Sequence, residues 1–100
     1  MTRERDIRKA LKKRVEEYGG EVRAVSWIGR KHAPDVLCLF TTEHWGGDIP
    51  RYHCFVETKA PGGKLNAGQA REHERMRAAR CTVLAITTIE ELDTWLPPSN

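Results

Sequence analysis

The sequence has no apolar run that approaches the roughly eighteen residues a membrane-spanning helix needs. Its three cysteines, Cys38, Cys54 and Cys81, are odd in number and widely spaced, which excludes a closed disulfide framework and a zinc-finger spacing. No two of the four histidines lie four residues apart, so the helical zinc-binding pattern is missing too. The charged N-terminal residues are unlike a signal peptide. We therefore expect a soluble, cytoplasmic protein with buried, reduced thiols.

Length and composition favour one folded domain. A chain of 100 residues can build a single modest core but not two. With 39% hydrophobic and 31% charged residues, the composition is that of a globular protein. The sequence contains no internal repeat and no low-complexity tract. We expect one domain over residues 1–100.

Charge of opposite sign alternates along the chain. Residues 1–31 hold ten Lys or Arg against five Asp or Glu, and residues 60–80 hold five against two. Between them, residues 32–59 hold two against four. Basic segments around a small acidic cluster suit a protein that binds a polyanion and keeps a cation between its carboxylates. Charge alone leaves open that the basic residues are only solvated helix faces.

Apolar periodicity predicts seven secondary-structure elements in the order α-β-β-β-α-β-α, which implies a mixed β-sheet flanked by helices. The second and third strands favour an antiparallel hairpin, joined by a turn or longer loop. The helix after the third strand is long enough to form a parallel crossover to the fourth. The first strand is predicted at 21–28, with a bulge or an end near Ser26. Helices are predicted at 3–18, 66–80 and 89–96, the other strands at 35–40, 51–59 and 82–86, and the hairpin loop at 41–50.

Charged residues gather where the two hairpin strands meet. Glu57 and Lys59 end one strand and, being two residues apart, project from the same face. Asp35 begins the other strand, so pairing brings it within reach of Glu57. Two carboxylates form the oxygen site that Mg²⁺ or Mn²⁺ binds together with phosphate and water. Glu4 lies a heptad before Leu11 and is expected on the buried side of the first helix.

These residue types suit phosphodiester hydrolysis. A metal polarises a phosphoryl oxygen and lowers the pKa of a bound water, while a cation such as Lys59 orients that water or balances the developing charge. The loop with Gly62, Gly63 and Lys64 adds backbone N–H groups and positive charge. An acid-x-Lys triplet occurs about once by chance in such a composition, so its position at a strand end matters more than its presence.

The residues in this order resemble the PD-(D/E)xK nucleases and, among them, the virus-type replication-repair nuclease (VRR-NUC) domain. The resemblance covers nearly the whole chain and implies an α/β fold with a restriction-endonuclease-like core. Its most specific part is the spacing from the Glu57-x-Lys59 triplet, across a glycine-containing loop, to Gln69. The matching features are Glu4, Gly29, Pro34-Asp35, Glu57-Thr58-Lys59, Pro61-Gly62-Gly63 and Gln69.

The resemblance also implies a role for each of these side chains. Asp35, Glu57 and the backbone carbonyl of Thr58 are expected to bind a divalent cation, Mg²⁺ or Mn²⁺. Glu4 is expected to support that cation directly or through water, although an acidic residue is also favoured in any first helical turn. The remaining catalytic positions are Lys59, the catalytic lysine, and Gln69, which completes the site.

Basic residues in the loops beside the site are candidates for phosphate contact, with solvation as the alternative. Standalone members of this size resemble phage-encoded homodimers that cut branched DNA such as Holliday junctions or flaps, and the same domain in larger proteins serves DNA repair. We expect a homodimer here as well, because symmetric cleavage needs two sites. If the chain is phage-encoded, the host cytoplasm is its expected location. The candidate DNA contacts are Arg30, Lys31, His32 and Lys64.

Two features depart from the family pattern. The connection between Asp35 and Glu57 is longer than a compact hairpin, and Arg80-Cys81 stands where a glycine often follows the second helix. Two other functions stay open, namely a non-catalytic branched-DNA-binding subunit and an RNA-processing nuclease. The intact carboxylates and lysine argue against the first, since a binding module has no reason to bury unpaired carboxylates together.

Overall fold

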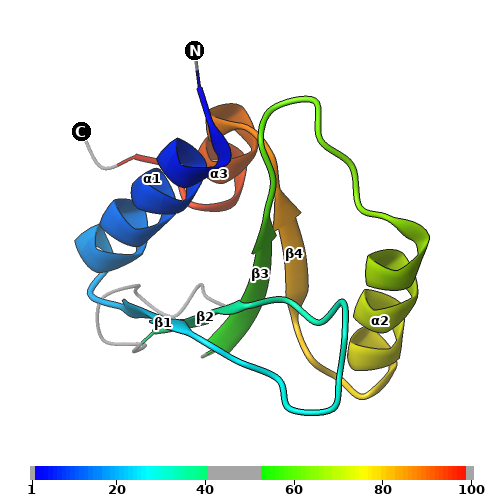
Figure 1. Cartoon of the computed structure of the whole chain (residues 1–100). Coiled ribbons are helices and arrows are strands. Elements are labelled where there is room, and N and C mark those ends of the chain that lie inside the picture. Colours follow the sequence, from blue (N-terminus) through cyan, green and yellow to red (C-terminus); the bar gives the residue numbers. More distant parts are fainter. Residues whose placement is uncertain (1, 41–52, 99–100) are drawn as a thin grey trace.

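A computed structural model describes residues 2–40 and 53–98 of the chain. Four strands form one mixed sheet in the order β1-β2-β3-β4, in which β2 runs antiparallel to both neighbours and β4 runs parallel to β3. Three helices flank this sheet (Figure 1). The elements are α1 (Glu4–Glu17), β1 (Glu21–Ala24), β2 (Val36–Leu39), β3 (His53–Thr58), α2 (Ala67–Ala78), β4 (Val83–Ile86) and α3 (Ile89–Trp95).

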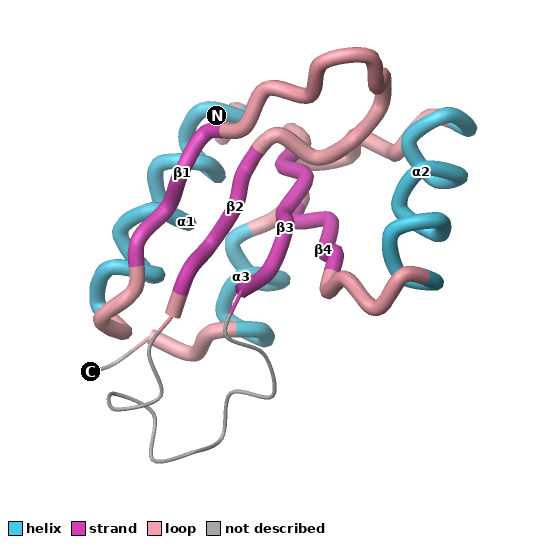
Figure 2. Tube along the Cα trace, turned by 90° about the horizontal axis from the view of Figure 1, so that it is seen from below, coloured by secondary structure: helices cyan, strands magenta, loops and turns pink. Residues whose placement is uncertain are grey.

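The helices form separate layers on the two sides of the sheet. α1 and α3 lie together on one side, whereas α2 stands apart on the other side next to β4 (Figures 1 and 2). The main core lies beneath α1, where Ile7, Leu11 and Val15 recur every four residues and are fully buried. Burying each such side chain contributes roughly 1.5–3 kcal/mol. The strands contribute Val36, Cys38, Cys54, Val56 and Ile86 to this cluster, and the C-terminal segment adds Leu92 and Leu96.

The turn after α1 fixes where that helix lies on the sheet. A Cβ atom on Gly20 would lie 2.5 Å from the carbonyl oxygen of Leu39 and 2.9 Å from a methyl group of Val15, so only glycine fits. Arg14 pairs with Asp93 of α3 at 2.9 Å. With its C-terminal end held in this way, α1 presents its first turn to the end of β3, where the charged residues gather.

The type and order of the predicted elements are confirmed, as are the antiparallel hairpin and the parallel crossover. The first strand is a correction, because it ends at Ala24 and not at residue 28. Val25 still donates to the carbonyl of Asp35 at 2.9 Å, but Trp27 then turns its indole N–H onto the carbonyl of Pro34 at 2.7 Å. The predicted loop 41–50 and the start of the predicted strand 51–59 lie outside the described residues.

All three thiols are free, as expected, but only Cys38 and Cys54 are buried, and Cys81 is a correction because it is only partly buried. Cys38 and Cys54 lie opposite each other on β2 and β3, and burial raises the pKa of both thiols to about 12. Arg80 adopts a φ of 73°, a left-handed conformation that favours glycine, which agrees with the family pattern at that position. Over residues 2–40 and 53–98, no helix is both long and apolar enough to cross a membrane.

Candidate active site

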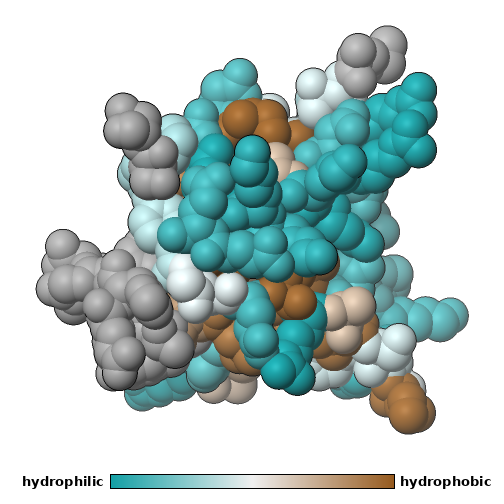
Figure 3. Space-filling view, turned by 90° about the vertical axis from the view of Figure 1, so that its left-hand side faces the viewer, coloured by the Kyte–Doolittle hydropathy of each residue, from teal (hydrophilic) through white to brown (hydrophobic). Residues whose placement is uncertain are grey.

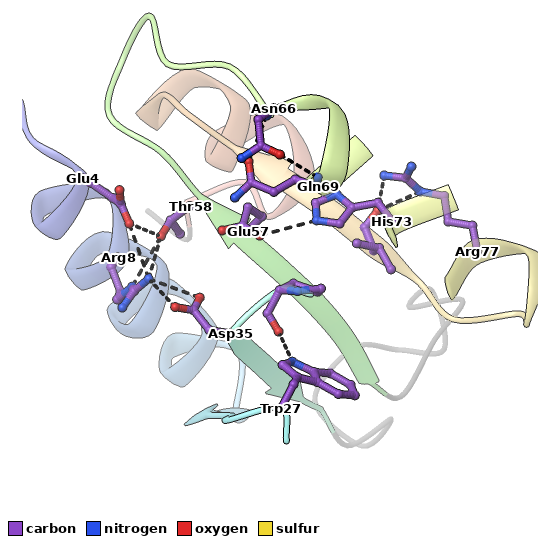
Figure 4. A network of polar contacts seen from close by, with 12 residues as sticks. Glu4, Arg8, Trp27, Asp35, Glu57, Thr58, Asn66, Gln69, His73 and Arg77 are labelled. Carbon is purple, nitrogen blue, oxygen red and sulfur yellow. Dashed lines mark hydrogen bonds and ion pairs between the residues drawn. The ribbon is translucent and has the colours of Figure 1, made fainter. Parts of the chain in front are cut away.

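Strand register brings the two central carboxylates together. Val36 of β2 is paired with Val56 of antiparallel β3, so Asp35, one residue earlier, lies opposite Glu57, one residue later. Figure 4 shows both side chains at this end of the sheet. The two carboxylates also interact electrostatically, because the negative charge of Asp35 adds to burial in raising the pKa of Glu57. The predicted pairing of these two residues is therefore present in the fold.

The backbone that carries Asp35 is held by the segment that follows β1. The hydrogen bonds from Val25 and from the Trp27 indole reach Asp35 and its neighbour Pro34. The Trp27 ring in turn lies 5.6 Å from the ring of Phe55, on β3. Pro34 is fully buried, whereas the Asp35 side chain is 50% exposed. Asp35 thus stands on a fixed backbone with its carboxylate open to solvent.

Glu57 has a very different environment. The residue is only 8% exposed, and burial, followed by the charge of Asp35, raises the pKa of its carboxyl from 4.5 to about 6. Its Oε1 atom is buried and has no hydrogen-bond partner among the described residues. Nε2 of His73 lies 3.4 Å from that oxygen, close enough for an ion pair but not aligned as a hydrogen bond. An aligned N–H donor or a cation beside this oxygen would satisfy it.

The donor set fits a hard divalent cation. Asp35, Glu57 and the carbonyl of Thr58 would supply oxygen ligands, which Mg²⁺ and Mn²⁺ prefer. The described residues contain no group of three or more His, Cys, Asp or Glu side chains arranged to hold a metal ion. Mg²⁺ usually keeps several waters and binds through one or two carboxylates. The site is an open two-carboxylate pair, not a closed protein cage.

Glu4 approaches this pair from α1 but is not buried as expected, because 47% of its side chain is exposed. Its carboxylate faces Thr58, whose hydroxyl donates to Glu4 Oε2 at 3.4 Å. A role for Glu4 through water, as the family resemblance allows, therefore suits its position better than direct ligation.

Arg8 is a member of the site that sequence reasoning missed. Its Nη2 atom lies 3.3 Å from both carboxylate oxygens of Asp35, 3.5 Å from Glu4 and 3.2 Å from the hydroxyl of Thr58 (Figure 4). Arg8 stands four residues after Glu4, so the two share one helix face. This four-residue spacing is the sequence feature that could have identified Arg8 as part of the site. The guanidinium balances the charge of two carboxylates on the α1 side of the site.

Lys59 lies immediately after β3. Its backbone N–H donates to the carbonyl of Ile86 at 3.1 Å, which continues the ladder with β4. Its side chain is partly buried, and its positive charge lowers the pKa of Glu57. The Lys59 ammonium makes no ion pair with any of the described residues. The charge of Lys59 is therefore available to a bound anion.

Gln69 lies in the first turn of α2, where it forms a reciprocal capping box with Asn66. The Gln69 backbone N–H donates to the Asn66 side chain at 2.8 Å, and the Gln69 side-chain oxygen accepts from the Asn66 N–H at 3.0 Å. The side-chain amide of Gln69 keeps two N–H donors. In Figure 4 this side chain lies between Asn66 and Glu57, so capping and site duties are compatible.

The four predicted DNA contacts separate into two groups. Arg30 pairs with Glu72 of α2 at 2.5 Å, and this contact holds the pKa of Glu72 below its usual range. The ring of His32 lies so close to Gly68 that a Cβ there would come within 2.6 Å of it. Both residues therefore tether the loop before Asp35 to α2. Lys31 and Lys64 are exposed and make no ion pair with any described residue, so both can reach phosphate.

Comparison with known proteins agrees with this fold. No family model matches the chain. "Putative nuclease p44" of Acyrthosiphon pisum secondary endosymbiont phage 1 is 34% identical over 100 residues, covering 100% of this chain and 98% of that protein. A solved structure of a "VRR_NUC domain" has a TM-score of 0.77 and 32% identity, covering 100% of both chains. The chain therefore belongs to the VRR_NUC family of nucleases.

Proposed function

We propose that this chain is a metal-dependent endonuclease that hydrolyses phosphodiester bonds in branched DNA. The observation that carries the proposal is the Asp35–Glu57 pair, which holds one buried, unpartnered carboxylate oxygen next to the unpaired cation of Lys59. A divalent cation would bind such a pair of carboxylates, and a phosphodiester would pair with the lysine. Membership of a nuclease family supports the same reaction.

The residues of the site divide the reaction between them. Asp35, Glu57 and the Thr58 carbonyl would hold a divalent cation, which when bound would polarise a phosphoryl oxygen and lower the pKa of a water. Lys59 then orients the attacking water or balances the charge that develops on the phosphoryl group. Gln69 can donate from its amide to an oxygen in the same space.

Three further cations surround the reacting group. Arg8 can contact a phosphate beside Asp35, because its planar guanidinium matches phosphate geometry and its side chain is 44% exposed. Lys31 and Lys64 lie on the two loops next to the carboxylates and are exposed. Such contacts position a nucleic-acid backbone without reading its sequence, which suits an enzyme that recognises branched DNA by shape.

The proposal includes a homodimer, because a branched substrate calls for more than one subunit. One subunit of 100 residues has little surface with which to grip a junction, and two symmetric cuts need two active sites. The relative of known source is a phage protein, which supports action in the cytoplasm of an infected host cell. Light scattering tests the dimer, and a monomer that still makes paired nicks would overturn it.

The deciding experiment is cleavage of a labelled four-way junction beside linear duplex and single strand of the same sequence. Each substrate is incubated with Mg²⁺, Mn²⁺ or a chelator, using wild type, Lys59→Ala and the control Lys13→Ala, which removes an exposed lysine of α1. We expect metal-dependent cutting of the junction that Lys59→Ala abolishes and Lys13→Ala preserves. Cutting that survives chelation or Lys59→Ala would overturn the mechanism.

The same assay separates the two other functions. Tight junction binding without cutting of any substrate would show a non-catalytic binding subunit. Faster cutting of an RNA version of the junction would show an RNA-processing nuclease.

A further inference from the structure

The mechanism above does not use His73, a histidine of α2 that contacts the site. His73 is fully buried, and neither of its ring nitrogens has a hydrogen-bond partner among the described residues. Its Nε2 atom lies 3.4 Å from Oε1 of Glu57, and Figure 4 shows the ring directed toward that carboxylate.

The two unsatisfied atoms face each other. Buried polar atoms without partners are rare, because each costs about 1–3 kcal/mol. An imidazole can offer one N–H from Nε2, and a carboxylate oxygen accepts it. A small shift that aligns and shortens the observed 3.4 Å contact would therefore satisfy Glu57 Oε1 and His73 Nε2 together.

The tautomer of the His73 ring decides which of its nitrogens can donate. A neutral imidazole carries its proton on only one nitrogen, so Nε2–H leaves Nδ1 without a proton.

The helix that carries His73 is anchored on both sides. Arg77, one turn further along the same face, donates to the carbonyl of Val83 at 2.9 and 3.2 Å and so ties α2 to β4. Glu72 ties the other side of α2 to the loop before Asp35 through Arg30. Gln69, one turn earlier, faces the same site. His73 is thus held in place by contacts that do not involve the carboxylates.

We propose that His73 is a positioning residue that donates a hydrogen bond from Nε2–H to Oε1 of Glu57 and so orients that carboxylate toward a divalent cation. The inference rests on the proposed function, because it assigns Glu57 to cation binding. Hydrogen-bond partners of metal-ligating carboxylates typically change metal affinity by about 10- to 100-fold when they are removed. A ring that served only to fill space would have no such effect.

Mn²⁺ binding to the purified protein, measured by titration calorimetry, tests the role without relying on activity. We expect His73→Leu, which fills similar space without a donor, to weaken Mn²⁺ binding about 10- to 100-fold. His73→Gln keeps an N–H donor and should recover most of that loss. His53→Leu, at an exposed position at the start of β3, is the matched control and should bind as wild type does. Urea unfolding of each variant confirms that it is folded.

Cleavage kinetics add a second readout. With His73→Leu we expect the Mn²⁺ concentration for half-maximal cutting to rise by the same factor, with kcat at saturating Mn²⁺ close to wild type. If His73→Leu does not fold, His73→Phe takes its place as a ring without a donor. In the wild type, nitrogen NMR of the imidazole needs no variant and should show the proton on Nε2.

The outcomes separate the inference from the function on which it rests. If the wild type binds no Mn²⁺, the proposed metal-dependent function fails. If the wild type binds Mn²⁺ and the folded His73→Leu or His73→Phe protein binds it equally well, only the role of His73 is overturned. A proton on Nδ1, or His73→Gln as weak as His73→Leu, would overturn it in the same way.

Discussion

The two sides of the candidate site differ in how fully their polar groups are satisfied. Toward α1, the hydroxyl of Thr58 lies between Glu4 and Arg8, and Arg8 also reaches Asp35, so each group has a partner. Those three charged side chains are 44–50% exposed. Toward α2, Glu57 Oε1 and a fully buried His73 lie 3.4 Å apart without an aligned hydrogen bond.

The difference indicates where the ligand is expected. Exposed ion pairs contribute little and exchange readily with solvent, so the α1 side is satisfied at small cost. A buried carboxylate oxygen without a partner destabilises the fold and is typical of a functional site. The proposed function accordingly gives cation binding to Glu57 with Asp35, and a supporting role to Glu4 and Arg8.

The largest difference between the two sides should appear in cleavage when one carboxylate on each side is neutralised. Glu57→Gln removes a charge that would hold the cation, and we expect cleavage to fall about 100-fold or more. Glu4→Gln acts at most through water and should cost only about tenfold. Steady-state cleavage of a labelled junction at saturating Mn²⁺ measures both, and a larger loss for Glu4→Gln would reverse the assignment.

Stability without metal should depend on pH through Glu57. Its pKa is raised from 4.5 to about 6 in the folded state, so the folded protein holds this proton more tightly than the unfolded chain. The stabilisation that the folded state gains by holding this proton is therefore complete below about pH 4.5 and is lost as the pH rises through about 6. The shift corresponds to about 2 kcal/mol of unfolding free energy.

Urea unfolding in chelator from pH 4 to pH 8 tests this effect. The difference between wild type and Glu57→Gln isolates the one carboxyl, because the other titrating groups are shared. We expect Glu57→Gln to gain about 2 kcal/mol relative to wild type across this range. A constant difference would show that the carboxyl is not destabilised by burial.

The smallest effect should come from the α1 side. Arg8→Ala removes contacts to Asp35 and Glu4, but these side chains are about half exposed and the charges are screened. We expect a loss of about 0.5 kcal/mol in the metal-free protein. Urea unfolding at pH 8 measures it, and a loss several times larger would show that the Arg8 network holds the fold together.

The central pair of the site could be predicted from the sequence because local patterns determine it. Two apolar runs predict two strands, and the residues Asp35, Glu57 and Lys59 follow from where those runs begin and end. Once the two strands pair as a hairpin, their register places Asp35 opposite Glu57. The family resemblance added Gln69, which the structure places in the first turn of α2.

The roles of Arg8 and His73 depend on packing that no local pattern specifies. Each lies on a helix, and spacing along a helix does not show which strand residue its side chain meets across the interface. Arg30 illustrates the same limit of local patterns. It is a basic loop residue predicted to contact DNA, but in the structure it pairs with Glu72 of α2. The early end of β1 has a similar cause, since the Trp27 indole finds its acceptor in the next loop.

Surface hydropathy gives a broader contrast between the site and its surroundings. The face in Figure 3 is largely hydrophilic, with small separate apolar areas. Ile28 is 98% exposed, and it lies in the loop that Arg30 ties to α2. A single exposed apolar side chain is ordinary on a protein surface. The buried, unpartnered carboxylate of Glu57 is the more informative exception.

The most direct test is anomalous diffraction from crystals of the protein grown with Mn²⁺. We expect one strong anomalous peak per chain beside the carboxylates of Asp35 and Glu57, absent in Glu57→Gln and present in Glu4→Gln. A peak between Glu4 and Asp35 with Arg8 displaced, or no peak near Glu57, would contradict the assignment of the cation to the buried α2 side.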